Sequence, residues 1–372
     1  MFEYETIDVA VAFNRVVAER YGKNVFRGVK KRFRRAPLKQ TRVKTGYRQE
    51  EAITVGALEL KGIRGIFGVG EGPVLFAQVR EDFEREVGDL FDAVQKQLDT
   101  ASIYKGKAIT ATREFLDLSG VSMDGIIYSD KVLQDLKDNV WTLIEQPEVC
   151  ISAGIKIRRK VLFSGKYGTG KTVAAMLTGQ KAVNSGWTFI YLEPTAGIES
   201  AAVNFVLELA RKYQRAVVLI EDVDREQGRG DPYVIGQIMA SIDGVMSKNG
   251  EVLVVMTTNH LDKLTGGIQR PGRIDKTINF SRFGGTDTER LLKVIIPAEY
   301  LSPDIDWSNV AKACDDYAPA FVSGVGTSAK LAAISRTQDS RPMVTEELLI
   351  EVAMDLHEQH KACSLEQPGF RA

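Results

Sequence analysis

The chain has 372 residues, 44% of them hydrophobic, and its 49 Lys and Arg residues balance its 49 Asp and Glu residues. This length predicts two or three domains with sizeable cores, and it excludes a short peptide-like module. Because the basic and acidic residues are equal in number, the net charge by itself indicates no class of partner.

The three cysteines, Cys150, Cys314 and Cys363, lie far apart in the chain. Their spacing excludes a disulfide framework and a thiolate metal cluster, and it fits a reducing compartment. The N-terminal residues lack the basic and then apolar pattern of a signal peptide, and no apolar stretch approaches the length of a membrane span. We therefore expect a cytoplasmic protein with no membrane partner.

The sequence of residues 1–112 predicts that they form an N-terminal α+β domain, which we expect to bind a partner or substrate. Residues 1–19 alternate as a strand would but also fit one face of a helix, so both alternatives stay open. Residues 52–78 are typical of strands broken by glycines. Residues 81–101 carry apolar side chains at helical spacing, which favours a helix packed on that sheet over a coiled coil. A strand-like segment within 102–110 is expected to close the domain.

A basic segment at residues 20–48 contains twelve of the Lys and Arg residues and no Asp or Glu. The rest of the chain then carries 37 basic and 49 acidic residues, a net charge of −12. Aromatic side chains interleave the basic ones, which would suit contact with nucleic acid or another polyanion. The alternative is a solvated arm or a basic surface at a subunit contact.

From residue 113 onward, short apolar runs alternate with helical patterns. This alternation predicts a parallel sheet with helices on both faces, which makes residues 113–282 an α/β nucleotide-binding domain. After Phe280 only helical patterns remain, so we expect residues 283–372 to form a helical lid domain. The predicted strands lie at residues 160–164, 187–192, 216–220 and 251–256.

The first of these strands leads into a match to the P-loop pattern G-x-x-x-x-G-K-[ST], also called Walker A. Glycines let the backbone wrap a phosphate chain closely, and the loop amides and the helix N-terminus direct positive charge at it. Lys171 adds a full charge, and the Thr172 hydroxyl ligates Mg²⁺. The strand–loop–helix context disfavours a plain glycine-rich turn. The candidate nucleotide-binding residues here are Gly165, Lys166, Tyr167, Gly168, Thr169, Gly170, Lys171, Thr172 and Val173.

Two further strands end in polar residues that suit the same site. Glu221 and Asp222 follow the strand at 216–220, where carboxylates belong beside the metal and the attacking water. Together with Thr172 they are the candidate Mg²⁺ ligands, and Asp224 is an alternative acid. Asn259 follows the next strand, where a neutral amide can orient the water.

Arg270 and Arg273 lie in the segment Gln-Arg-Pro-Gly-Arg-Ile-Asp at residues 269–275. Two arginines held by a Pro-Gly turn suit an arginine finger that reaches the γ-phosphate in a neighbouring subunit. The alternative is a structural salt bridge.

These motifs, in this order and spacing, resemble those of the AAA family, the core clade of the AAA+ ATPases. The likeness runs from about residue 115 to residue 362. Residues 115–120, with Asp117, resemble the family's linker that touches adenine, and residues 155–172 and 257–275 resemble its P-loop segment and second region of homology. The resemblance implies a ring, usually a hexamer, that binds ATP and Mg²⁺ at subunit boundaries. It also implies catalytic roles for Glu221, Asp222, Asn259, Arg270 and Arg273.

Three departures from the family pattern bear on function. Lys166 and Tyr167 replace two prolines. The Walker B acids are Glu-Asp, not Asp-Glu, so the shorter Asp222 takes the water-activating role. The loop at 193–200 lacks the aromatic residue with which threading members grip a peptide, and the second axial loop would be 225–231. We expect ATP-driven, chaperone-like remodelling of a protein or protein complex. The alternatives are a nucleic-acid-directed motor or loader and an ATP-gated scaffold with weak turnover.

Overall fold

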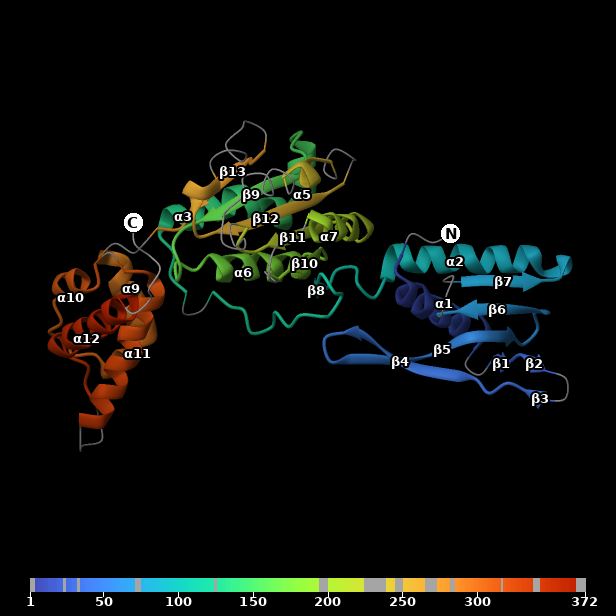
Figure 1. The fold of residues 1–372 in the computed structure, drawn as a ribbon, viewed down its shortest axis with the longest axis horizontal. Coiled ribbons are helices and arrows are strands. Elements are labelled where there is room, and N and C mark those ends of the chain that lie inside the picture. Colours follow the sequence, from blue (N-terminus) through green and yellow to red (C-terminus); the bar gives the residue numbers. More distant parts are fainter. Residues whose placement is uncertain are drawn as a thin grey trace.

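The computed structural model describes most of the chain (Figure 1). The described residues are 4–22, 25–31, 34–70, 75–123, 126–193, 200–223, 239–244, 250–264, 273–281, 285–315, 317–336 and 342–365. The axial-loop segments 194–199 and 225–231, together with Asp224 and Arg270, lie outside these ranges.

The N-terminal part is a small antiparallel sheet covered by two helices, of which the sequence predicted one. The sheet order is β1-β5-β6-β7, with β4 paired to the other part of β5. Helices α1 and α2 lie together along it (Figure 1). The elements are α1 Thr6–Tyr21, β1 Phe26–Gly28, β2 Lys30–Lys31, β3 Arg34–Arg35, β4 Lys39–Gly46, β5 Gln49–Leu60, β6 Gly65–Val69, β7 Leu75–Val79 and α2 Glu84–Ala101.

Helix α1 decides between the two alternatives for residues 1–19. Its face from Val9 to Val17 is buried together with Leu90 and Leu98 of α2. The helix lies between the sheet and the second helix, so it is buried on more than one side. This burial explains why apolar residues occupy nearly every position from Val9 to Val17. The spacing of apolar residues in α2 is likewise used for packing on this core.

The basic segment 20–48 is built largely into strands and is not a free arm. Strand β4 pairs antiparallel with β5 from Lys39 opposite Val55 to Gly46 opposite Gln49. The alternation of β4 buries Val43 and exposes Arg42 and Lys44. The basic side chains therefore lie on the solvent side of a strand whose other side contributes to the core.

The central part is a six-stranded parallel sheet in the order β13-β9-β12-β11-β10-β8. This arrangement confirms the predicted P-loop α/β fold class. Four of its strands match predicted ones: β9 Arg159–Ser164, β10 Thr188–Leu192, β11 Ala216–Ile220 and β12 Val252–Thr258.

The two edge strands correct the expected pattern. Strand β8, Ala108–Thr110, pairs with β10 and so belongs to the central sheet, whereas the sequence placed it at the close of the N-terminal domain. Strand β13, Lys276–Asn279, pairs with β9 and was not predicted. Both are short, and edge strands need not carry the continuous apolar run of a strand that is buried on both faces.

Helices cover both faces of the sheet. Helix α6, Lys171–Asn184, packs on the face that contains Phe189 and Leu219, and α7, Ser200–Lys212, packs on the face that contains Ile190 and Val218. The remaining helices of this part are α3 Asp130–Leu136, the π-helical turn Lys137–Trp141, α4 Thr142–Glu145 and α5 Pro147–Ser152.

A separate cluster of helices follows, at one end of the molecule in Figure 1. Its core includes Leu292, Val310, Val322 and Leu349, one from each helix. The four helices are α9 Gly285–Ile295, α10 Trp307–Ala313, α11 Pro319–Arg336 and α12 Glu346–Leu365. None of the described helices has the length and apolar character that crossing a membrane requires.

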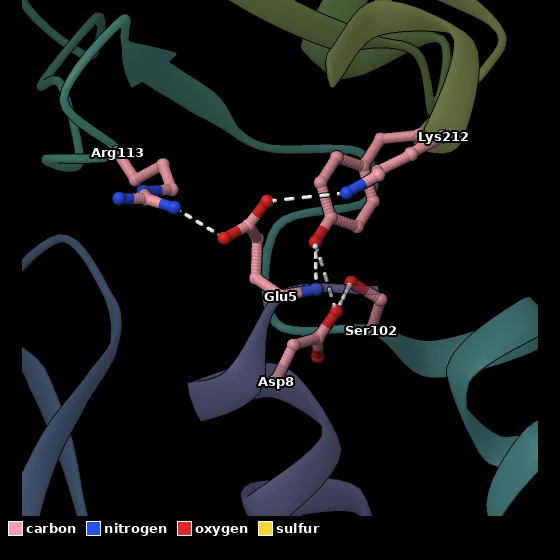
Figure 2. Close-up of polar contacts among 6 residues, drawn as sticks. Glu5, Asp8, Ser102, Arg113 and Lys212 are labelled. Atoms are coloured by element: carbon pink, nitrogen blue, oxygen red, sulfur yellow. Dashed lines mark hydrogen bonds and ion pairs between the residues drawn. The ribbon is translucent and has the colours of Figure 1, made fainter. Parts of the chain in front are cut away.

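The N-terminal part is joined to the central part by a polar contact around the start of α1. Glu5 forms ion pairs with Arg113, which follows β8, and with Lys212 at the end of α7 (Figure 2). Beneath them, the backbone N–H of Glu5 donates to the hydroxyl of Tyr213, which in turn donates to Asp8. The apolar core continues across this junction, because Val9 and Val206 belong to the same cluster of buried residues.

Candidate nucleotide-binding site

The loop between β9 and α6 has the backbone conformation that its glycines predict. Gly168 has φ = 74° and Gly170 has φ = 91°, a region that side chains with a Cβ rarely occupy. A Cβ on Gly170 would also lie 3.1 Å from the ring of Tyr128, which donates a hydrogen bond to the Gly170 carbonyl over 3.0 Å. The loop is thus shaped for close approach of a ligand to its backbone.

Lys171 lies at the start of α6 with its ammonium group at the mouth of this loop. Its Nζ donates to the carbonyl oxygens of Gly165, over 2.6 Å, and Lys166, over 2.9 Å. It also donates to Oδ1 of Asn259 over 2.9 Å. The side chain is only 6% exposed, so its charge acts where water screens it weakly.

Asn259 is positioned by the order of the strands. It follows β12, which lies between β9, the strand before the P-loop, and β11, the strand before the two acids. Its Oδ1 accepts from Lys171 and its Nδ2 donates to Oδ1 of Asp222 over 2.8 Å. One neutral amide therefore connects the phosphate-binding lysine to the carboxylate predicted to activate water.

Asp222 has a left-handed backbone with φ = 47°. Its N–H donates to Oγ1 of Thr257 over 2.9 Å, and the next N–H, of Val223, donates to the Thr257 carbonyl. Asp is among the few residues that tolerate this conformation. The turn interrupts the strand alternation that would point Glu221 and Asp222 to opposite faces, and Asp222 lines the pocket described below.

Glu221 is 8% exposed and sits at the end of β11. Its Oε2 accepts a hydrogen bond from the hydroxyl of Tyr191 over 2.8 Å. Its Oε1 is buried and has no hydrogen-bond partner among the described residues. A buried carboxylate oxygen without a donor is costly unless a cation satisfies it.

A cavity of about 410 Å³ opens beside these groups, between the central sheet and the helical cluster. The P-loop, Asp222 and Asn259 form its polar wall. Ile126, Ile127 and Leu291 contribute an apolar wall, and Pro319 and Ala320 of α11 close it. The N–H of Ala320 donates to the Gly168 carbonyl over 3.1 Å, so the helical cluster contacts the P-loop directly.

The remaining P-loop candidates are also at or near this cavity. Tyr167, Thr169, Thr172 and Val173 line it, and Tyr167 is 69% exposed with its ring 6.3 Å from that of His260. Lys166 lines a neighbouring cavity instead. The structure therefore places all the predicted P-loop residues except Gly165 and Lys166 at this cavity.

Asp117 is not among the residues that line this cavity. Its exposed carboxylate accepts from the N–H and the hydroxyl of Ser119, and these bonds lower the pKa of Asp117. The residues of this segment that line the cavity are Ile126, Ile127 and Tyr128. They form an apolar run just before a predicted helix, whereas the family spacing favours residues 115–120.

Arg273 is half-buried just before β13. The neighbouring Asp275 fixes this segment to β9: its Oδ2 accepts from the Lys160 N–H over 2.7 Å, and its own N–H donates to the Lys160 carbonyl. Arg270 lies outside the described residues.

The residues present fit a Mg²⁺–nucleotide ligand. The cavity has the volume of a small-molecule site, and it combines an apolar wall with a few convergent polar groups. The glycine loop offers backbone amides and a lysine for phosphates. Thr172 lines the cavity, whereas Glu221 does not line it but directly precedes Asp222, which does. The hydroxyl of Thr172 and the partnerless Oε1 of Glu221 are oxygen ligands of the kind that Mg²⁺ prefers.

Comparison with known proteins agrees with this geometry. A family model described as "ATPase family associated with various cellular activities (AAA)" matches residues 161–282. The chain is similar to the ATP-dependent zinc metalloprotease FtsH of Mycoplasma mobile, with 28% identity over 58% of this chain and 32% of that protein. It is also similar to the proteasome-activating nucleotidase of Methanosarcina mazei, with 27% identity over 62% of this chain and 57% of that protein.

A third relative is proteasome-activating nucleotidase 2 of Haloferax volcanii, which is 27% identical over 70% of this chain and 64% of its own length. The chain thus matches less than two thirds of the length of each of these relatives. The matched residues cover the P-loop, both acids and Asn259, and the matches confirm the ligands expected for these motifs, ATP and Mg²⁺.

Proposed function

Because this chain belongs to the AAA family of ATPases, we propose that it forms a ring that hydrolyses Mg-ATP at subunit boundaries and uses the energy to remodel a protein or protein complex. The observation that carries the proposal is the hydrogen-bonded series from Lys171 through Asn259 to Asp222. It links a phosphate-binding group to a carboxylate of the kind that activates water, and a mere nucleotide-binding scaffold would not require it.

Each residue in the series has a definite chemical task. Lys171 neutralises charge at the β- and γ-phosphates. Asp222 accepts a hydrogen bond from the attacking water and takes up its proton, while the Asn259 amide holds the carboxylate in place. Thr172 and Glu221 would hold Mg²⁺, which when bound neutralises charge on the phosphate oxygens.

The short Asp222 side chain suits this task because of its backbone. The left-handed turn at Asp222 places its carboxylate at the cavity wall, within 2.8 Å of the Asn259 amide. Because Asp222 reaches the cavity, we infer that the Glu-Asp order is compatible with hydrolysis.

We place the arginine finger on Arg273 and Arg270, acting on the site of a neighbouring subunit. The lid is suited to report the state of the nucleotide, since Ala320 is bonded to the P-loop at Gly168. Loss of the γ-phosphate would alter this contact and move the lid against the next subunit. The N-terminal domain, anchored on α7, would pass this motion to a partner protein or adaptor.

The relatives support remodelling of proteins in general terms, since their names describe a protease and proteasome-activating nucleotidases. The substrate of this chain is a separate proposal, and we assign its recognition to the N-terminal domain.

A nucleic-acid-directed motor is the second candidate, favoured by the exposed basic side chains of β3 and β4. Arg34, Arg42 and Lys44 are exposed, whereas Arg35 pairs with Glu59. Salt-dependent binding of a fluorescent single- or double-stranded oligonucleotide, lost in the variant Arg34→Ser/Arg42→Ser/Lys44→Ser, would favour this function. Lack of binding at low salt would exclude it.

The test of the leading proposal is steady-state ATP hydrolysis as a function of protein concentration. We expect specific activity to rise with concentration as the ring assembles. The variant Arg273→Ala should bind ATP but lose turnover, whereas Arg336→Ala, which loses only an exposed ion pair with Glu351 within the helical cluster, should behave as wild type.

A mixing experiment separates a finger in trans from a structural role of Arg273. Arg273→Ala and Asp222→Asn subunits should each be inactive alone. Mixed, they should regain part of the activity, because an intact arginine of one subunit can complete the intact P-loop site of the other. Binding and assembly of the wild type without turnover above background would contradict the proposed enzyme and favour the ATP-gated scaffold.

A further inference from the structure

The one protein group bonded to the buried carboxylate of Glu221 in the described part of the chain is the hydroxyl of Tyr191. Tyr191 lies on β10, next to β11, and its donor bond to Oε2 is 2.8 Å long. Neither the P-loop pattern nor the acid pair indicates a role for this tyrosine. Because of this bond, Oε2 of Glu221 accepts a hydrogen bond, whereas Oε1 has no hydrogen-bond partner among the described residues.

Strand pairing explains why these two side chains meet. Tyr191 is opposite Leu219 in the parallel register, and both belong to the core on the α6 face. Glu221 is two residues after Leu219, so the alternation of an extended chain brings it to the same face. A tyrosine is long enough to reach the next position along the neighbouring strand, where a shorter side chain would not.

The backbone of Tyr191 is held on both sides of its strand. Its carbonyl accepts from the Ala111 N–H over 2.8 Å, and β10 is paired with both β8 and β11. The phenol is therefore fixed at the position from which its hydroxyl donates to Glu221.

We propose that Tyr191 is a positioning residue for the Mg²⁺ site: by donating to Oε2 of Glu221, it holds the carboxylate so that the partnerless Oε1 is the oxygen offered to the metal. This inference rests on the proposed function, because it assumes that Glu221 serves Mg²⁺ at the ATP site. It also gives a reason for glutamate in place of aspartate. The longer side chain can reach the tyrosine with one oxygen and the metal with the other.

The physical consequence concerns metal affinity more than nucleotide affinity. Without the hydroxyl, Oε2 competes with Oε1 and the carboxylate can rotate. Removal of such outer-shell partners typically costs roughly 10- to 100-fold in metal affinity or activity. The phosphate contacts of the P-loop do not involve Tyr191 and should be preserved.

The experiment measures binding of a fluorescent non-hydrolysable ATP analogue to the full chain as Mg²⁺ is titrated, so it does not depend on turnover. We expect Tyr191→Phe to raise the Mg²⁺ concentration at half-effect by about tenfold. Binding of the analogue in EDTA should equal that of the wild type. The matched control is Tyr21→Phe, which removes a 3.1 Å Tyr–Glu bond in the N-terminal domain and should leave the Mg²⁺ midpoint unchanged.

A double-mutant cycle tests the mechanism. Glu221→Asp shortens the side chain by one methylene and should lose the bond to Tyr191, raising the Mg²⁺ midpoint by itself. Adding Tyr191→Phe to Glu221→Asp should then have little further effect, because the two residues act as a unit. Fully additive effects would overturn the proposal.

Other outcomes separate this inference from the proposed function. If Mg²⁺ does not change analogue binding to the wild type, the Mg-ATP site itself is wrong. If the wild type depends on Mg²⁺ but Tyr191→Phe matches the Tyr21→Phe control, only the role of Tyr191 is wrong. Weaker binding of Tyr191→Phe in EDTA as well would show a distorted pocket and would also overturn the positioning role.

Discussion

The hydroxyl of Tyr213 donates a 3.3 Å hydrogen bond to Oδ2 of Asp8, although 205 residues separate them in the chain. Asp8 is 1% exposed and Tyr213 is fully buried, so this bond lies inside the junction between the N-terminal and central parts. Asp8 also accepts from the hydroxyl of Ser102, over 2.6 Å, and the N–H of Ile103, over 3.0 Å (Figure 2 shows the Ser102 contact). One carboxylate thus joins α1, the connecting segment and the end of α7.

We predict that Tyr213→Phe loosens this junction without unfolding either part. The variant removes one donor to Asp8 and leaves the Glu5 N–H without its acceptor, which should cost about 1–3 kcal/mol locally. Hydrogen exchange of the amides in α1 and residues 101–113 should accelerate. Tyr104→Phe is the control, since its hydroxyl makes no hydrogen bond within the described residues; equal acceleration in both variants would contradict the prediction.

Asp8 should make the stability of the junction depend on pH. Burial is the largest influence on Asp8 and raises its pKa, despite hydrogen bonds that act in the other direction. The folded state therefore binds the proton more readily than the unfolded state, and stability falls as pH rises from the ordinary pKa of Asp through the raised one. Above that range the contribution is lost.

The measurement is the free energy of unfolding of the wild type and of Asp8→Asn, determined at several pH values. The difference, wild type minus variant, should decrease as pH rises across this range, because Asn does not titrate. A difference that is constant or increases with pH would contradict the raised pKa of Asp8.

Asn259→Ala should separate hydrolysis from binding. The change removes the amide's hydrogen bonds to Lys171 and to Asp222, but it removes no group expected to contact the nucleotide base. We expect the single-turnover rate to fall about 100-fold, the size typical of a lost acid–base arrangement, with a much smaller change in nucleotide affinity. The control is Asn309→Ala, which removes an amide that bonds to Asp306 and Glu346 in the lid. A parallel loss of rate and affinity would indicate collapse of the pocket.

The backbone at Asp222 predicts an unusual order of stability. With φ = 47°, glycine is favoured over alanine at this position. The free energy of unfolding of Asp222→Gly should therefore be about 1 kcal/mol higher than that of Asp222→Ala. Both variants should lack turnover. Thermal or denaturant unfolding of the two proteins measures the difference, and a more stable alanine variant would show that the left-handed turn is absent in solution.

Local patterns predicted the parts of this protein that depend on neighbouring residues in the chain. The strand, glycine loop and helix around Lys171 are contiguous, so their pattern could be read directly. The long apolar periodicity of α2 and the buried runs of β10 and β11 also define their elements. Helix α1 was ambiguous because burial on several sides removes the polar face that distinguishes a helix from a strand.

Contacts between distant segments were decided by tertiary structure. Short edge strands such as β8 and β13 form only when a neighbouring strand offers its hydrogen-bonding groups. Which residues before α3 line the cavity has a similar origin, since Ile126, Ile127 and Tyr128 reach it only because α9 and α11 pack on its other side.

The sequence by itself identified the chemical groups of the candidate site: a P-loop lysine at the start of a predicted helix, and an acid pair and an amide that each follow a predicted strand. The tertiary structure alone decided how those groups combine. Placing β12 between β9 and β11 lets Asn259 bridge Lys171 and Asp222, and the parallel register of β10 and β11 brings Tyr191 to Glu221. The physical reason is that strand order and register arise from packing of the whole sheet, whereas residue type and local conformation arise from the chain itself.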